Sequence, residues 1–185
     1  MFGLRKFCDG HRLVKNLTTI LLSGISCSLI VYSLIVQAGD IITSGCKKIG
    51  FYNYCFNNET SAGCYCITQL KDLHAVGFPA SEGLLVALVL TYSSLVTSFA
   101  GFLVLGLAQY FHDCTLWMFA LVCHALGLTS LFLGLIMKLI MMGRFLELSQ
   151  LSQGFLALLL AIAGLCVLCL IMRHYASLKM KNLEI

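Results

Sequence analysis

Four long apolar stretches limit what this chain can fold into. They cover about residues 17–37, 83–108, 115–138 and 154–173. A helix needs roughly 20 apolar residues to cross a hydrocarbon core about 30 Å thick. Backbone groups in hydrocarbon must be hydrogen-bonded within their own segment, so each stretch is predicted to be a helix. The sequence therefore predicts an all-α membrane protein, a four-helix transmembrane bundle.

Composition agrees with this class of protein. Of 185 residues, 59% are hydrophobic and 11% are charged. A soluble domain of this length needs more polar surface than that to be hydrated. The net charge of +4 forms no concentrated basic face outside the two short termini, so nucleic acid is not expected as a partner. No linker or repeat divides the chain, and residues 1–185 are predicted to form one membrane domain.

Basic residues predict the orientation of the chain. They gather before the first stretch and after the last one: Arg5, Lys6, Arg12, Lys15, Arg173, Lys179 and Lys181. Four crossings place both termini on one side, and excess Lys and Arg mark the cytosolic side. Lys47, Lys48 and Lys71 fall in a long loop, where the rule is weaker. Both termini are predicted to be cytosolic, in the plasma membrane or an endomembrane.

The amino-terminal region also has the form of a secretory signal peptide. A basic segment precedes an apolar run, and Val36-Gln37-Ala38 would serve as the cleavage site. The run is about 20 residues long, whereas signal peptides usually have 7–15 apolar residues, so a membrane span is favoured. Cleavage would leave three crossings and an outside amino terminus.

The loop of residues 38–82 contains the most specific sequence features. It holds Cys46, Cys55, Cys64 and Cys66, and Asn58-Glu59-Thr60 is an N-glycosylation sequon. The predicted orientation exposes both features to an oxidising compartment, where disulfides persist. Four cysteines allow three pairings, and their spacing does not choose among them. Zinc sites prefer two to four residues between ligands, so Cys64-x-Cys66 favours disulfides over a metal.

The segment from Gly50 to Cys55 resembles the first outer loop of the claudin and peripheral myelin protein superfamily, in which a second cysteine follows after eight to ten residues. Eight residues separate Cys55 from Cys64 and ten separate it from Cys66, so either fits. Gly50 matches the glycine of that motif, and Phe51 and Tyr52 stand where the superfamily has leucine and tryptophan. A further superfamily tryptophan ahead of the glycine is missing, since Val36 stands at the comparable distance. Claudin barrier strands and pores are therefore not expected.

A closer resemblance is to the transmembrane protein 140 family of four-span proteins. It covers residues 49–53, continues through 73–79, and includes cysteines matching Cys55 and Cys66. The resemblance implies a Cys55–Cys66 disulfide, which leaves Cys46 and Cys64 as an extra pair. It also implies a small extracellular β-sheet above the bundle, with Phe51, Tyr52 and Tyr54 resting on the outer ends of the helices.

Polar residues inside membrane spans are candidates for function. His124 would be a proton relay or a metal ligand, but the apolar stretches contain no second histidine or carboxylate as its partner. A neutral histidine bonded to a neighbouring helix is favoured. Lys138 lies near a span boundary and, with Arg144, is expected to extend toward the headgroups.

No paired carboxylates, histidine pair or glycine-rich phosphate loop are found in the sequence. We therefore expect no enzyme activity, cofactor, metal or small-molecule substrate. Cys8 and Cys114 lie next to predicted cytosolic span ends and are candidates for palmitoylation, although free cysteine is also an ordinary buried residue. Ser94-x-x-x-Ser98 and Ala157-x-x-x-Ala161 offer small faces for helix contact.

The sequence favours a non-catalytic protein that acts by lateral or extracellular association, or by modulating another membrane protein. Its expected partners are membrane lipids, other membrane proteins or a second copy of itself. The alternative is a small channel or transporter component, or an auxiliary subunit. That alternative predicts a continuous polar pathway lined by His124, Thr91, Thr97 and Thr129.

Overall fold

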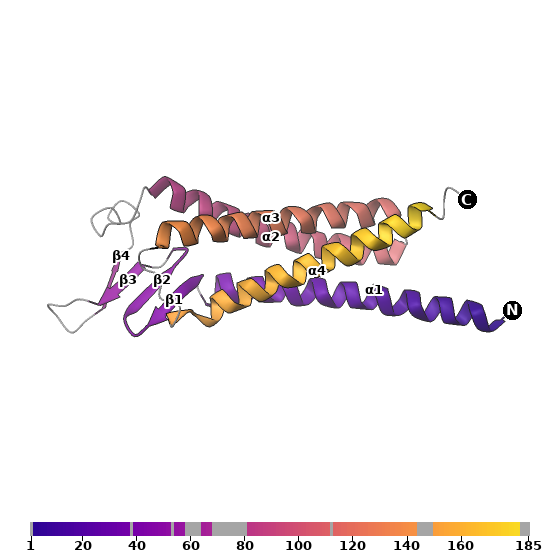
Figure 1. Cartoon of the computed structure of the whole chain (residues 1–185), viewed down its shortest axis with the longest axis horizontal. Coiled ribbons are helices and arrows are strands. Elements are labelled where there is room, and N and C mark those ends of the chain that lie inside the picture. Colours follow the sequence, from indigo (N-terminus) through magenta and orange to yellow (C-terminus); the bar gives the residue numbers. More distant parts are fainter. Residues whose placement is uncertain are drawn as a thin grey trace.

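The computed structural model places four long helices in a bundle and a small β-sheet at one end of it (Figure 1). It describes residues 2–37, 39–52, 54–57, 64–67, 81–111, 113–143 and 150–181. The amino and carboxyl termini lie at the end of the bundle opposite to the sheet.

The helices are α1 (Phe2–Val31), α2 (Ser81–Phe111), α3 (Cys114–Met142) and α4 (Gln153–Lys181), and α1 continues as the π-helix η1 (Tyr32–Val36). Each contains a segment long and apolar enough to cross a membrane: Asn16–Val36, Glu82–Phe111, Cys114–Met142 and Gln153–Ala176. The four predicted spans are thus confirmed as apolar helices of an integral membrane protein. The helices α1 and α4 extend past them, because a helix satisfies its own backbone groups in water as well as in lipid.

Small residues bring α2 and α3 close together. A Cβ atom added at Gly127 of α3 would lie 2.5 Å from Ser98 Oγ of α2. One added at Gly134 would lie 3.0 Å from the backbone oxygen of Ala87 and 3.0 Å from the backbone nitrogen of Thr91. Ser98 is fully buried here, as the predicted small face requires. Small residues allow close backbone approach, which drives helix association in lipid.

Replacing Gly134 with alanine is expected to lower the free energy of unfolding by about 1–3 kcal/mol, because the new methyl group meets backbone atoms that cannot move aside. Gly106→Ala in α2 is the matched control, since nothing lies within 4 Å of a Cβ atom there. Alanine favours helix by up to about 1 kcal/mol over glycine, so this control should be neutral or stabilising. Unfolding of both variants in mixed micelles measures the difference. Equal effects would show that the helices are not closely packed at Gly134.

The sheet is antiparallel, with strand order β1 (Asp40–Ser44), β2 (Lys47–Gly50), β3 (Tyr54–Asn57) and β4 (Cys64–Ile67). Its pairing aligns one residue from each strand into rows across the sheet. The inner row faces the helices and is buried: Ile42, Ile49, Tyr54 and Ile67. The outer row faces away from them: Thr43, Lys48, Cys55 and Cys66. The two faces differ because side chains alternate along a strand.

Ser152 connects the sheet to the start of α4. Its Oγ atom accepts a hydrogen bond from the backbone nitrogen of Phe155 at 3.1 Å, which caps the helix. The same hydroxyl donates to the backbone oxygen of Asp40, and the Ser152 nitrogen donates to the Ile41 oxygen at 2.9 Å. Strand β1 is therefore held against the bundle by main-chain contacts as well as by its apolar side chains.

Candidate functional site

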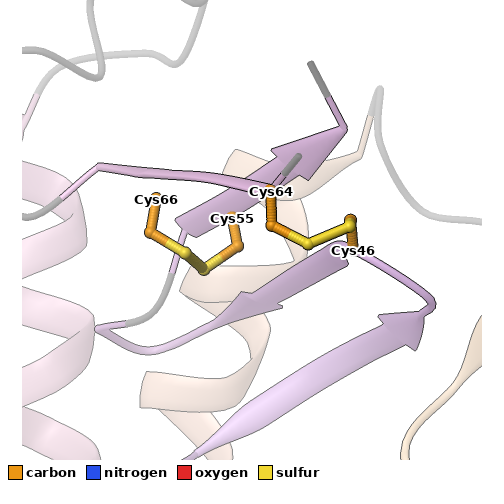
Figure 2. Close-up of a disulfide and its surroundings, with 4 residues drawn as sticks. All are labelled: Cys46, Cys55, Cys64 and Cys66. Atoms are coloured by element: carbon orange, nitrogen blue, oxygen red, sulfur yellow. A yellow bond between two sulfur atoms is a disulfide. The ribbon is translucent and has the colours of Figure 1, made fainter. Parts of the chain in front are cut away.

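Two disulfides cross the sheet, Cys46–Cys64 and Cys55–Cys66 (Figure 2). Cys55 and Cys66 are directly opposite each other on β3 and β4, with Cα atoms 4.0 Å apart. Cys46 lies in the turn between β1 and β2, with its Cα atom 5.3 Å from that of Cys64. This is the pairing that the family resemblance implies. Since Cys64 and Cys66 are two residues apart on one strand, both disulfides lie on the outer face.

Gly50 allows β1 and β2 to approach each other closely. A Cβ atom at this position would lie 2.6 Å from the Gly39 oxygen and 2.8 Å from the Asp40 Cα atom. Any larger residue would therefore push the two strands apart. The backbone nitrogen of Phe51 then donates a hydrogen bond to the Gly39 oxygen at 3.0 Å. The motif glycine is thus explained by sheet packing.

The two aromatic residues that follow Gly50 have different surroundings. Phe51 is buried, whereas Tyr52 is 44% exposed and its ring centroid lies 6.5 Å from that of Tyr92 on α2. Tyr54, the third aromatic residue of the segment, is buried in the inner row. The segment thus supplies two buried rings under the sheet and one exposed ring beside α2.

The prediction that Lys138 extends toward the headgroups is wrong. Its side chain is 0% exposed, and its Nζ atom donates a hydrogen bond to the Tyr54 hydroxyl. The ammonium lies 4.5 Å from the centroid of the Tyr54 ring and 5.9 Å from that of Phe51. Lys138 lies on the helix face that also carries the buried Leu131 and Leu135, and this face points into the bundle below the sheet. The two rings stabilise the cation there.

Tyr54 links Lys138 to the sheet backbone. Its hydroxyl accepts the lysine hydrogen bond and donates one to the Phe51 oxygen at 3.3 Å. Burial raises the pKa of Tyr54 to about 12, so the phenol is neutral at physiological pH and keeps the proton that it donates. Lys138, Tyr54 and Phe51 together form what we call the junction between the sheet and α3. Arg144, the other predicted headgroup contact, lies outside the described residues.

His124 is bonded to a neighbouring helix, as predicted. Its Nε2 atom lies 3.1 Å from Ser23 Oγ of α1, and the side chain is fully buried. A Cβ atom at Gly101 of α2 would lie 3.0 Å from the imidazole ring, so the ring fills the space that this glycine leaves. Within the described part of the chain, no group of three or more His, Cys, Asp or Glu side chains is arranged to hold a metal ion.

The remaining predicted positions are spread along the chain. Asn58 lies outside the described residues. Cys8 is in α1, but its side chain is not among those described, and Cys114 is half-buried at the first residue of α3. Sequence reasoning missed the junction. An intramembrane cation needs a partner. Because the four predicted apolar stretches contain no carboxylate, the aromatic residues of the loop were the signal that could have identified the partner of Lys138.

These features define a class of protein: an integral membrane protein with four apolar helices, in which two disulfides stabilise a small sheet between the first and second helices. A comparison with known families is more specific. The model of the TM140 protein family matches residues 9–183. The chain therefore belongs to the TM140 protein family.

Proposed function

We propose that this protein is a non-catalytic, multi-pass membrane protein that acts through association with other membrane proteins, either laterally or through its sheet. One observation carries this proposal: the side chains that a polar pathway would use are bonded within the bundle. The hydroxyl groups of Thr91, Thr97 and Thr129 each donate to a carbonyl oxygen of their own helix. His124 contacts Ser23.

The apolar interior supports association over conduction. Fully buried apolar side chains contributed by all four helices and η1 fill the bundle, among them Ile30, Leu34, Leu105, Leu131 and Leu165. A channel or transporter component needs a hydrated route past such a layer. The sheet, in contrast, presents exposed Thr43 and Lys48 on a face rigidified by two disulfides. Rigid surfaces of this kind bind partners at a low entropic cost.

We further propose a claudin-like organisation, with the sheet outside and both termini in the cytosol. The support is the order of elements, one span, a disulfide-stabilised sheet and three more spans, together with Gly50 and the Cys55–Cys66 bond. Disulfides persist in the exterior and in the secretory lumen. In this orientation Asn58 is a glycosylation site, and Cys8 and Cys114 face the palmitoylation machinery of the cytosolic leaflet.

Asn58→Gln is expected to remove the only glycan of the chain when it is expressed in mammalian cells. Asn16→Gln is the matched control: it changes the other sequon-like triplet, which precedes the first span on the cytosolic side, and should leave the glycan in place. Electrophoresis before and after glycosidase treatment measures the difference. A chain that is unglycosylated, or whose glycan disappears in the Asn16 variant, contradicts the proposed orientation.

Photo-crosslinking in intact cells tests the association. A photoreactive amino acid replaces Lys48 on the outer face of the sheet, Phe132 on the exposed surface of α3, or the buried Phe155 as the control. Discrete adducts at Lys48 indicate extracellular association, and adducts at Phe132 indicate lateral association. No adduct above the Phe155 control, together with ion flux through proteoliposomes of the pure protein, would refute the proposal in favour of a channel.

A further inference from the structure

An apolar groove runs along the outside of α1. It is lined by residues of α1 and η1 that recur about one turn apart, from Ile20 to Tyr32, and by Phe102 of α2. Its volume of about 510 Å³ is within the range of about 300–1,000 Å³ that is usual for small-molecule sites. Two of its lining residues, Leu21 and Ile25, are 54% and 57% exposed, so the groove opens to the surroundings of the bundle. These residues belong to an apolar span, and the surroundings are therefore lipid.

Two small residues, Gly24 and Ser28, form the floor of the groove between larger side chains. A Cβ atom added at Gly24 would lie 3.5 Å from the ring of Phe102, so this ring forms a wall beside the glycine. Ser28 is exposed, and its hydroxyl donates to the backbone oxygen of Gly24 at 2.9 Å. Because this hydroxyl is bonded within its own helix, the floor offers a ligand mainly apolar contacts.

Three neutral polar side chains meet at the Tyr32 end of the groove. The Tyr32 hydroxyl donates to Gln153 Oε1 of α4 at 3.3 Å and accepts a hydrogen bond from Gln37 Nε2 at 2.9 Å. A carboxamide has two N–H donors and an oxygen with two lone pairs, so the two amides can also bind a further hydroxyl group. Phosphate is bound best by charged donors. These uncharged side chains therefore favour a neutral ligand group.

This polar end lies at the edge of the apolar part of the bundle, on the side of the sheet. The apolar span of α1 and η1 ends at Val36, and that of α4 begins at Gln153. Both limits are helix ends, since Gln37 and Ser152 next to them lie outside helices. The two ends are level, because a Cβ atom added at Gly154 would lie 2.9 Å from Gln37 Cβ. The polar groups are thus close to the membrane surface.

The length of the groove corresponds to one leaflet. With a rise of 1.5 Å per residue, the distance along the helix from Tyr32 to Ile20 is about 18 Å. Half of the hydrocarbon core is about 15 Å thick. A ligand whose polar group lies beside Tyr32 would therefore occupy the groove within the leaflet next to the sheet. Such a ligand needs one small, neutral hydrogen-bonding group and a long apolar body.

We infer that this groove binds a sterol, with its hydroxyl at Tyr32, Gln37 and Gln153 and its ring system along the floor. A sterol has one hydroxyl, which both donates and accepts, on a flat and rigid apolar body. A phospholipid would bring a charged phosphate to neutral partners, and its flexible chains would lose more conformational freedom than rigid rings on binding. The inference goes beyond the proposed association with proteins and does not depend on it.

Photolabelling of the full-length protein in phosphatidylcholine vesicles tests the site. Two probes are compared: a cholesterol analogue with a diazirine in its ring system, and phosphatidylcholine with a diazirine in one acyl chain. Mass spectrometry of the digested protein locates the labels. We expect the sterol probe to label residues 20–32 in preference to other exposed helix surfaces, and the acyl probe to show no such preference. Unlabelled cholesterol should displace the sterol probe from this segment, whereas cholestane, which lacks the hydroxyl, should not.

Two variants test the two parts of the groove. Ser28→Phe fills the floor and should abolish the displaceable labelling. Thr129→Phe is its matched control, because Thr129 is also exposed, with its hydroxyl bonded to its own helix, and does not line the groove. Tyr32→Phe keeps the ring but removes the hydroxyl, and should weaken displacement by cholesterol about fivefold, the effect of one neutral hydrogen bond. Tyr110→Phe makes the same change at an exposed residue far from the groove and should have no effect.

The inference is overturned if the acyl probe shows the same preference for residues 20–32 as the sterol probe, or if cholestane displaces the sterol probe as well as cholesterol does. It is also overturned if either groove variant behaves like its control. Monodisperse elution in detergent verifies the folding of each variant, and the comparison of cholesterol with cholestane on the wild-type protein decides the question if a variant does not fold. These measurements use the pure protein, so the inference and the proposed association fail separately.

Discussion

Replacing Tyr54 with phenylalanine is expected to lower the free energy of unfolding by about 3 kcal/mol. The substitution keeps the buried ring but removes the hydroxyl that accepts the hydrogen bond of Lys138. The ammonium is 0% exposed, so water cannot replace the lost acceptor without opening the junction. A buried charge that loses its hydrogen-bond partner carries its full desolvation cost.

The opposite substitution, Lys138→Met, is expected to cost less than about 1 kcal/mol. The tyrosine hydroxyl still donates to the Phe51 oxygen, so no polar group of the junction loses its only bond. Methionine fills much of the volume of the lysine stem between Phe51 and Tyr54. Unfolding in mixed micelles should therefore rank Tyr54→Phe well below Lys138→Met in stability.

The double variant, Tyr54→Phe/Lys138→Met, completes the cycle. With the charge removed, the missing hydroxyl has no cation left to stabilise, so the double variant should be about as stable as Lys138→Met alone. Strictly additive effects would show that the lysine and the tyrosine do not interact, and the junction as described would be refuted. The cycle also controls for loss of packing, since each single variant retains an apolar side chain of similar size.

We expect the second large effect on stability from removing the Cys55–Cys66 disulfide. The bond closes a chain separation of 11 residues, and Cys46–Cys64 closes one of 18. In the chain-entropy model, loops of this size stabilise the folded state by about 3 kcal/mol each. A sheet of four short strands cannot replace this contribution by core burial alone. Cys55→Ala/Cys66→Ala should therefore expose the sheet to proteolysis at a temperature that leaves the wild-type sheet intact.

Cys166→Ala is the control for the disulfide variant, because Cys166 is a free, exposed cysteine on α4. Its replacement should change the free energy of unfolding by less than about 0.5 kcal/mol. A reducing agent should weaken the wild-type sheet and have a smaller effect on the variant that lacks Cys55 and Cys66. Proteolysis at the same rate in the wild type and the disulfide variant would indicate that inner-row packing alone maintains the sheet.

The four helices were predictable from sequence because their cause is local. Each apolar stretch satisfies its own backbone in lipid, whatever the rest of the chain does. The same reasoning placed the span boundaries well inside the ends of α1 and α4, since hydropathy detects the apolar part of a helix and not its polar continuation. The cysteine pairing was different in kind: the residues left three choices, and a family resemblance selected one.

Lys138 marks the limit of such reasoning. Its distance from the end of an apolar stretch suggested a side chain extended to the headgroups. Its real environment depends on which face of α3 points inward and on where residues 51–54, more than eighty positions earlier, fold back. By itself, the sequence determined that this chain crosses a membrane as four helices, because burial in lipid is a property of each segment. Only the tertiary structure decided that a buried cation joins the sheet to α3, because its partners are brought together by packing.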